Sequence, residues 1–243
     1  MFYIIGVGLS PKQMTLEAKQ AIDNCEEVYI DNYTNIFSNG NIKELEEIIN
    51  KKIIKLNRTE LEQEQRFIKD KSCLLVIGNA LSATTHYSIL QDAKKKGIDA
   101  KIIPGISIFN YKGAPGLYEY RFGQVVSIVF SRPNFHPTSF YNKIIDNLKI
   151  NTHTMCLMDI IVEENRFMKV TEACEILENI DTQKVLENKT CVALGAMGSE
   201  NQEIVTFDFK DYKKIKVNGF PQTLIICANL NEFERVGVNE YRR

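Results

Sequence analysis

Four sets of turns that follow apolar runs contain the residue types best suited to hold a small molecule. They cover residues 6–10, 78–86 and 104–110, and the pair 194–199 and 219–223. Each combines glycine with small or hydroxyl-bearing residues, and glycine allows positive φ angles and a close approach of the backbone to a ligand. The turn at 78–86 also opens a predicted helix, whose first N–H groups can donate to a ligand. Ordinary loop connections are the alternative interpretation of each turn.

The first turn, Gly-Val-Gly-Leu-Ser, does not match the common nucleotide-binding motifs. A Rossmann fingerprint needs a third glycine that opens a helix, but the chain continues with Pro11, Lys12, Gln13 and Met14. No Gly-Lys-Ser or Gly-Lys-Thr occurs in the sequence, so a P-loop is excluded as well. We therefore expect these turns to line a cleft for a different kind of small molecule.

Acid–base and metal chemistry have few candidates in this chain. The three histidines, His86, His136 and His153, lie far apart, and the six cysteines are scattered without a Cys-x-x-Cys pair. We expect no metal site and buried, reduced thiols. His86 is the obvious candidate for a general base and Asp159 a weaker one, but a histidine in the first turn of a helix also fits a structural role. We therefore assign no catalytic residue.

The composition bounds the class of protein. With 30 basic against 31 acidic residues, the net charge of −1 argues against a general nucleic-acid binder. No apolar stretch approaches the ~20 residues that span a bilayer, and the apolar run at 2–7 lacks the features of a signal peptide. We expect a cytoplasmic protein without a membrane partner.

Alternating strands and helices position the turns in the first half of the chain. Thr15 and Thr84 are predicted N-caps of two of these helices. Strands are predicted at 2–7, 27–30, 52–56, 74–77 and 101–103, and helices at 15–25, 42–50 and 84–95. This alternation predicts a mostly parallel sheet with helices on both faces.

The second half has strands in closer succession, which predicts a mixed sheet. Strands are predicted at 124–130, 154–160, 190–194, 203–209 and 223–228, and helices at 137–147 and 170–180. The change of character at the turn-forming residues Ala114-Pro115-Gly116 predicts a boundary. We expect two α/β domains, residues 1–114 and 115–243, with a cleft between them.

Several blocks of sequence, taken in order, resemble one family. They are Ala-Thr-Thr-His at 83–86, Ser-Ile-Phe-Asn at 107–110, Tyr-Arg-Phe-Gly at 120–123 and His-Thr-Met-Cys-Leu-Met-Asp-Ile at 153–160. The chain resembles the tetrapyrrole-methylase superfamily of S-adenosylmethionine enzymes, and within it the diphthine synthase family. The resemblance runs from residue 3 to about residue 230.

This resemblance implies a homodimeric α/β enzyme of diphthamide biosynthesis. Its activity would be methyl transfer from S-adenosyl-L-methionine to a histidine of translation elongation factor 2 that carries a 3-amino-3-carboxypropyl group. In eukaryotic-type members a carboxylate is methylated too. The implied cofactor contacts are Leu9, Asn79, Ser82, Ser107, Ile108, Met158, Met197 and Gln222.

The sequence departs from the family pattern at a few of these positions. Asn79-Ala80 stands where the family usually has Asp-Pro, and Gln222 stands where it usually has histidine. An asparagine keeps an acceptor oxygen but adds a donor. Two other hypotheses stay open: a superfamily member that methylates a tetrapyrrole or ribosomal RNA, and a cofactor-binding protein without catalysis.

Overall fold

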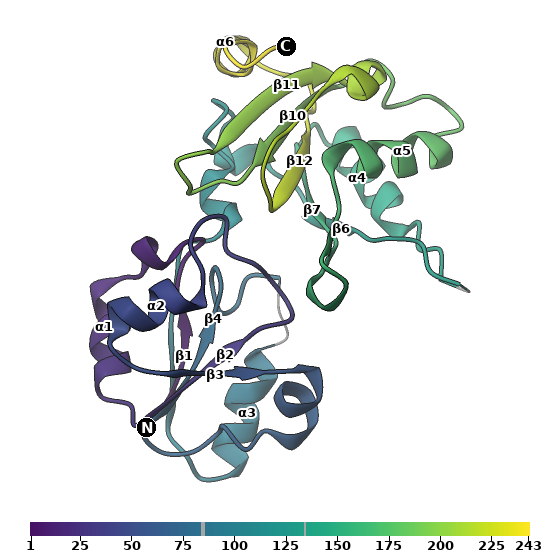
Figure 1. Cartoon of the computed structure of the whole chain (residues 1–243). Helices are drawn as coiled ribbons and strands as arrows, with labels where there is room; N and C mark the ends of the chain where they lie inside the picture. Colours follow the sequence, from purple (N-terminus) through teal and green to yellow (C-terminus); the bar gives the residue numbers. More distant parts are fainter. Residues whose placement is uncertain (84–85, 134) are drawn as a thin grey trace. The chain divides into compact units, whose positions relative to one another are not determined.

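The computed structural model describes residues 1–83, 86–133 and 135–243, which form two compact units (Figure 1). The first unit comprises residues 1–110 with 162–164 and 198–200, and the second comprises 111–161, 165–197 and 201–243. The expected domain boundary after residue 114 and the expected cleft stay predictions. No helix in the described ranges is both long and apolar enough to cross a membrane.

The first unit is built on a five-stranded sheet in the order β3-β2-β4-β1-β5, in which every pair is parallel. Its strands are β1 (Phe2–Gly6), β2 (Glu27–Asp31), β3 (Ile53–Leu56), β4 (Ser72–Val76) and β5 (Ala100–Ile103). Its helices are α1 (Leu16–Asp23), α2 (Ile42–Ile49) and α3 (Tyr87–Lys95). The predicted parallel sheet is confirmed.

Helices cover both faces of this sheet, which explains the almost continuous apolar runs of its strands. On one face Ile5 of β1 belongs to the same buried cluster as Ile22 of α1 and Leu45 of α2. On the other face Ile4 shares a cluster with Ile89 of α3. The predicted cap of α1 is confirmed, because the Thr15 hydroxyl accepts a hydrogen bond from Ala18 N at 3.1 Å. The other predicted cap, Thr84, lies outside the described residues.

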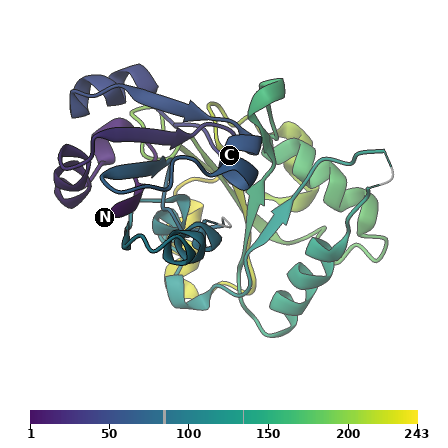
Figure 2. The same ribbon diagram turned by 90° about the horizontal axis from the view of Figure 1, so that it is seen from below.

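The second unit contains the predicted mixed sheet, in the order β11-β10-β12-β7-β6. Only β6 and β7 are parallel to each other. The strands are β6 (Val126–Ile128), β7 (Thr154–Met158), β10 (Thr190–Gly195), β11 (Glu203–Asp208) and β12 (Gln222–Ile226). Helices α4 (Ser139–Lys149) and α5 (Val170–Ile180) pack against one apolar face of it (Figures 1 and 2).

The structure adds elements that the sequence patterns did not predict. The main ones are α6 (Glu232–Asn239) and a small hairpin of β8 (Ile160–Ile161) and β9 (Arg166–Phe167). Short 3-10 helices cover Pro11–Gln13, Ile108–Tyr111, Glu119–Arg121, Val162–Glu164 and Phe209–Lys214, and a π-helical turn covers Glu60–Glu64.

Candidate functional site

The first three predicted turns meet at the carboxyl ends of β4, β1 and β5, which are neighbours in the first sheet. The turns after β1 and β4 are joined directly: Gly8 N donates to Gly78 O at 3.2 Å, and Gly78 N donates to Gly8 O at 2.8 Å. Ligands of open parallel sheets bind at this edge of the strands. Turns that lie 70 residues apart in the sequence thus form one surface.

Glycines are required where these strands end, because the backbones touch. A Cβ atom on Gly6 would lie 2.6 Å from Gly105 N, and one on Gly105 would lie 2.3 Å from Gly78 O. Both distances are far below van der Waals contact, so side chains here would push neighbouring strands apart. Two of these glycines therefore have a packing role, in addition to any role beside a ligand.

Gly78 differs, because its missing side chain leaves usable space. Its φ of +87° suits glycine, and a Cβ atom would lie 3.8 Å from Ser107 Cβ and 3.9 Å from Leu9 Cδ2. Those are ordinary contact distances, so the space beside Gly78 is large enough for at least one methyl group. Two of the predicted cofactor contacts, Leu9 and Ser107, flank this space. An apolar wall beside a hydroxyl fits a ligand that has both apolar and polar parts, such as a nucleoside cofactor.

The other predicted contacts of this unit lie beside the same turns. Asn79 is half-buried, and its Nδ2 donates to Ser82 Oγ at 3.0 Å, which links two of the predicted residues. Ile108 is half-buried and starts a 3-10 helix directly after Ser107. The structure therefore brings the five predicted contacts of the first unit to one sheet edge, and their binding role remains a prediction.

Asn35 is a residue at this edge that the sequence reasoning missed. Its Nδ2 would lie 3.8 Å from a Cβ atom on Gly78, and it donates to Ile77 O at 3.4 Å. Asn35 follows β2, which adjoins β4. The signal that could have found it is its place shortly after a predicted parallel strand, where polar residues face the ligand edge.

His86 is fully engaged by acceptors inside the first unit. Its Nδ1 lies 3.2 Å from Ala80 O, and its Nε2 lies 3.2 Å from Asp31 Oδ2. Burial raises the pKa of Asp31, but hydrogen bonds from His86, Thr34 and Tyr33 outweigh burial and lower it below the usual value. Both ring nitrogens therefore face oxygen atoms of the protein, Ala80 O and Asp31 Oδ2, and not a substrate. This geometry supports the structural interpretation of His86.

In the second unit, the three predicted contacts lie at one end of the mixed sheet. Met158 ends β7 and Gln222 begins β12, one position beyond the paired residues Leu157 and Thr223. Gly195, at the end of β10, is the register partner of Gln222, and Met197 follows two residues later. All three predicted contacts are buried. The structure thus groups them, and their binding role also stays a prediction.

The Gln222 side chain already has partners within its own unit. Its Oε1 accepts from Val170 N at 2.8 Å, at the start of α5, and its Nε2 donates to Val217 O and Gly219 O, both at 3.1 Å. Burial and these three bonds fix the amide. A cofactor contact at this position would therefore use the backbone, the aliphatic stem or the second lone pair of Oε1.

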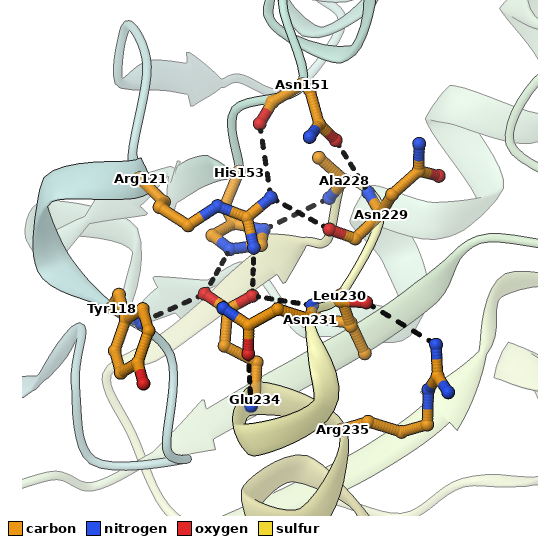
Figure 3. Close-up of polar contacts among 10 residues, drawn as sticks. All are labelled: Tyr118, Arg121, Asn151, His153, Ala228, Asn229, Leu230, Asn231, Glu234 and Arg235. Carbon is orange, nitrogen blue, oxygen red and sulfur yellow. Dashed lines mark hydrogen bonds and ion pairs between the residues drawn. The ribbon is translucent and has the colours of Figure 1, made fainter.

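A second polar cluster surrounds Glu234 on α6 (Figure 3). Glu234 Oε1 accepts from His153 Nε2 at 3.0 Å and from Tyr118 N at 3.2 Å. Its Oε2 accepts from Asn231 N at 3.2 Å and pairs with the Arg121 guanidinium. His153 and Glu234 are both completely buried. We name Arg121, His153 and Glu234 the Glu234 cluster.

The hydrogen bonds of the Glu234 cluster set its charge states. His153 Nδ1 accepts from Ala228 N at 3.1 Å, so the ring is a neutral tautomer that donates through Nε2. Burial lowers the pKa of His153. Burial raises the pKa of Glu234, but the bonds from His153, Tyr118 and Asn231 outweigh it and lower the pKa overall. Arg121 and His153 belong to sequence blocks that carry the family resemblance, and the structure gives them a shared structural role.

Glu234 itself was not singled out from the sequence. The available signal was the pair Asn231 and Glu234, whose spacing is that of a capping box. Glu234 N donates to Asn231 Oδ1 at 2.9 Å, so the capping box is present. The long-range contacts of the carboxylate could not be found from that spacing.

Comparisons with known proteins agree with these findings. The family model described as Tetrapyrrole (Corrin/Porphyrin) Methylases matches residues 1–212. The chain is 36% identical over 243 residues to the diphthine synthase of Staphylothermus marinus. The alignment covers 96% of this chain and 91% of the relative. It is 33% identical over 257 residues to the diphthine methyl ester synthase of Bos taurus, with coverages of 94% and 90%.

Solved structures show the same similarity. The crystal structure of a putative diphthine synthase from Entamoeba histolytica superposes with a TM-score of 0.90 at 31% sequence identity, covering 100% of this chain and 98% of that one. A second crystal structure of a diphthine synthase gives a TM-score of 0.88 at 26% identity, with coverages of 100% and 96%. The two-unit α/β architecture is therefore shared along the whole length of the chain.

Proposed function

Because the chain belongs to the tetrapyrrole methylase family, and within it to the diphthine synthases, we propose that it methylates translation elongation factor 2 with S-adenosyl-L-methionine as methyl donor. It is a methyltransferase of diphthamide biosynthesis. The proposed acceptor is the 3-amino-3-carboxypropyl group on a histidine of the elongation factor. We also propose a cytoplasmic homodimer, which rests on the family resemblance.

One observation in the structure supports this proposal most directly: the space above Gly78 between Leu9 and Ser107. Among the predicted contacts of the first unit, the apolar residues Leu9 and Ile108 suit the adenosine part of the cofactor. The polar residues Asn79, Ser82 and Ser107 suit its amino-acid part. When bound, the cofactor supplies an electrophilic methyl group on a sulfonium.

The residues of the chain need only bind and align the reactants. Alignment of nucleophile, methyl carbon and sulfur can contribute on the order of 7–11 kcal/mol at best. An amine acceptor must be unprotonated, and water can take its proton, so the reaction requires no dedicated base. This agrees with His86, whose ring nitrogens both face oxygen atoms of the protein.

Binding and transfer can be measured separately. Calorimetric titration with S-adenosyl-L-methionine is expected to give one binding site per chain. Incubation with elongation factor 2 that carries the unmethylated intermediate is expected to add methyl mass to the acceptor, seen by mass spectrometry. Cofactor binding without transfer to this acceptor would contradict the proposed substrate, and absence of binding would contradict the proposed cofactor.

Substitution of Gly78 by alanine tests the position of the cofactor. We expect Gly78→Ala to weaken cofactor binding at least tenfold, a loss of about 1.4 kcal/mol, because the methyl group occupies space between Leu9 and Ser107. Gly97→Ala is the matched control. Gly97 also has a positive φ, +70°, but among the described residues beyond its chain neighbours no atom lies within 4 Å of its Cβ position. Both variants therefore carry the same kind of backbone strain, roughly 1–2 kcal/mol.

The comparison of the two variants isolates the effect of the filled space. If Gly78→Ala and Gly97→Ala bind the cofactor equally well by calorimetry, the space above Gly78 is not the cofactor site. Equal losses of thermal stability in the two variants would confirm that the strain is matched.

A further inference from the structure

Arg166 in the β8–β9 hairpin has an unusual environment for a surface cation. Its guanidinium carbon lies 3.7 Å from the centroid of the Phe130 ring, so the two planar groups are in contact. Phe130 is 5% exposed, whereas Arg166 is exposed. Arg121, Arg242 and Arg243 form ion pairs within the second unit, but within the described ranges Arg166 forms none.

The hairpin holds Arg166 in place from both sides. Arg166 is the register partner of Ile161 in the antiparallel β8–β9 pair. The next residue, Phe167, packs against Phe220 with ring centroids 5.6 Å apart. A long, flexible side chain that already rests on a ring loses less conformational entropy when it binds a partner.

This cation lies at the sheet end where the predicted contacts of the second unit gather. Asp159, directly after Met158, accepts from Phe130 N through Oδ2 at 3.0 Å. The backbone carbonyl of Asp159 accepts from Met168 N, also at 3.0 Å. Asp159 therefore ties the ring under Arg166, and Met168 directly after strand β9, to the end of β7.

The stacked arrangement suits a carboxylate ligand. A guanidinium that lies on a ring keeps its N–H groups at its edge, where a fork of two parallel donors matches the two oxygens of a carboxylate. Contact with the buried ring also removes water from one face of the cation. A bidentate carboxylate from outside the chain would therefore find donors already oriented and only partly hydrated.

We propose that Arg166 binds the carboxylate of the 3-amino-3-carboxypropyl group and so determines specificity for this acceptor. This inference rests on the proposed function, which supplies the acceptor. The carboxylate lies next to the amine that is methylated, and its negative charge favours the protonated, unreactive ammonium. Pairing of that charge with Arg166 weakens this effect and leaves more of the amine with a free lone pair.

Substitution of Arg166 by glutamine tests the inference on the full-length enzyme. Arg166→Gln is expected to raise KM for the unmethylated elongation factor 10-fold to 100-fold, in line with the loss of a hydrogen bond to a charged group. The Kd for S-adenosyl-L-methionine, measured by calorimetry, is expected to stay within twofold. Arg166→Lys is expected to recover only part of the loss, because lysine lacks the planar fork.

Arg235→Gln is the matched control. Arg235 is an exposed arginine of the same unit, and its guanidinium donates to a backbone carbonyl, Leu230 O, at 3.5 Å. The KM of the Arg235→Gln variant is expected to equal that of the wild type. If Arg166→Gln unfolds, Phe130→Leu is the test variant instead. It removes the ring under Arg166 but keeps the cation and an apolar core residue, and a smaller rise in KM is expected.

Small inhibitors identify the recognised group. An imidazole that carries the 3-amino-3-carboxypropyl chain is expected to inhibit the wild type at least tenfold better than its carboxamide, and to lose this advantage with Arg166→Gln. The wild type could methylate the factor while Arg166→Gln shows the wild-type KM and the same preference for the carboxylate inhibitor. That result would show that Arg166 does not bind the carboxylate. Failure of the wild type itself to methylate the factor contradicts the proposed function instead.

Discussion

Replacement of Glu234 by glutamine is expected to lower the free energy of unfolding of the second unit by about 3–5 kcal/mol, the cost of removing one partner of a buried ion pair. Arg121 then keeps a largely buried charge without its carboxylate. The glutamine amide also carries an NH2 group in place of one carboxylate oxygen. In one orientation this donor faces the donors of Arg121 and Asn231 N, and in the other it faces those of His153 and Tyr118 N. Urea denaturation measures the total loss, and hydrogen exchange of residues 222–239 assigns it to this unit.

Glu232→Gln is the control for this prediction. Glu232 lies in the first turn of the same helix and is exposed. Its replacement removes the same charge near the helix N-terminus, which is expected to cost about 0.3–1 kcal/mol. A loss below 1 kcal/mol for Glu234→Gln would show that the Glu234 cluster does not stabilise the unit.

The same contacts predict the direction of the pH dependence. The pKa of His153 is lowered in the folded protein, so the unfolded chain binds a proton more readily, and stability falls as pH drops below about 6.5. The pKa of Glu234 is lowered too, so its contribution is present above about pH 4.3 and is lost as pH falls further. Protonation of His153 Nδ1 would also place a hydrogen against the N–H of Ala228.

His86→Ala is expected to destabilise the first unit by about 3 kcal/mol while turnover of the folded enzyme stays within about threefold. The stability loss is at the low end for a broken buried pair, because Asp31 keeps its hydrogen bonds from Tyr33 N and from Thr34. Turnover is expected to persist because both ring nitrogens of His86 already contact oxygen atoms of the protein. A general base would cost 100-fold to 10,000-fold, roughly, when removed.

Single-turnover rates at a temperature where the variant is folded measure this difference. A rate reduced 100-fold with unchanged cofactor binding would restore His86 as the general base. Asp31→Asn serves as the companion variant, because it removes the other half of the pair and leaves the His86 ring in place. Comparable losses of stability in the two variants would identify the Asp31–His86 contact as their common cause.

Much of the local structure follows from local sequence. The apolar runs of the first half, separated by helical patterns, predicted the five parallel strands, and the Thr15 cap marked the start of α1. Such features depend on residues within one turn or one strand, so the sequence displays them directly. The ordered blocks of residues between 83 and 160 likewise indicated the family before any coordinates.

The missed elements have physical reasons. The β8–β9 hairpin pairs only two residues per strand, too few for an alternation pattern. Helix α6 has a local capping box, but its anchor is the contact of Glu234 with Arg121 and His153, 113 and 81 residues away. Contacts over such distances depend on how strands and helices pack, which no spacing rule reports.

The sequence by itself determined that glycine turns follow the strands of an α/β enzyme and that these turns have the residue types of a small-molecule site. Only the tertiary structure decided what each turn residue does. It placed Gly6 and Gly105 in backbone contact and left space at Gly78, although all three are glycines after strands. It also assigned the Gln222 amide to the start of α5. The reason is that the role of a residue depends on the atoms around it, and those atoms come from distant parts of the chain.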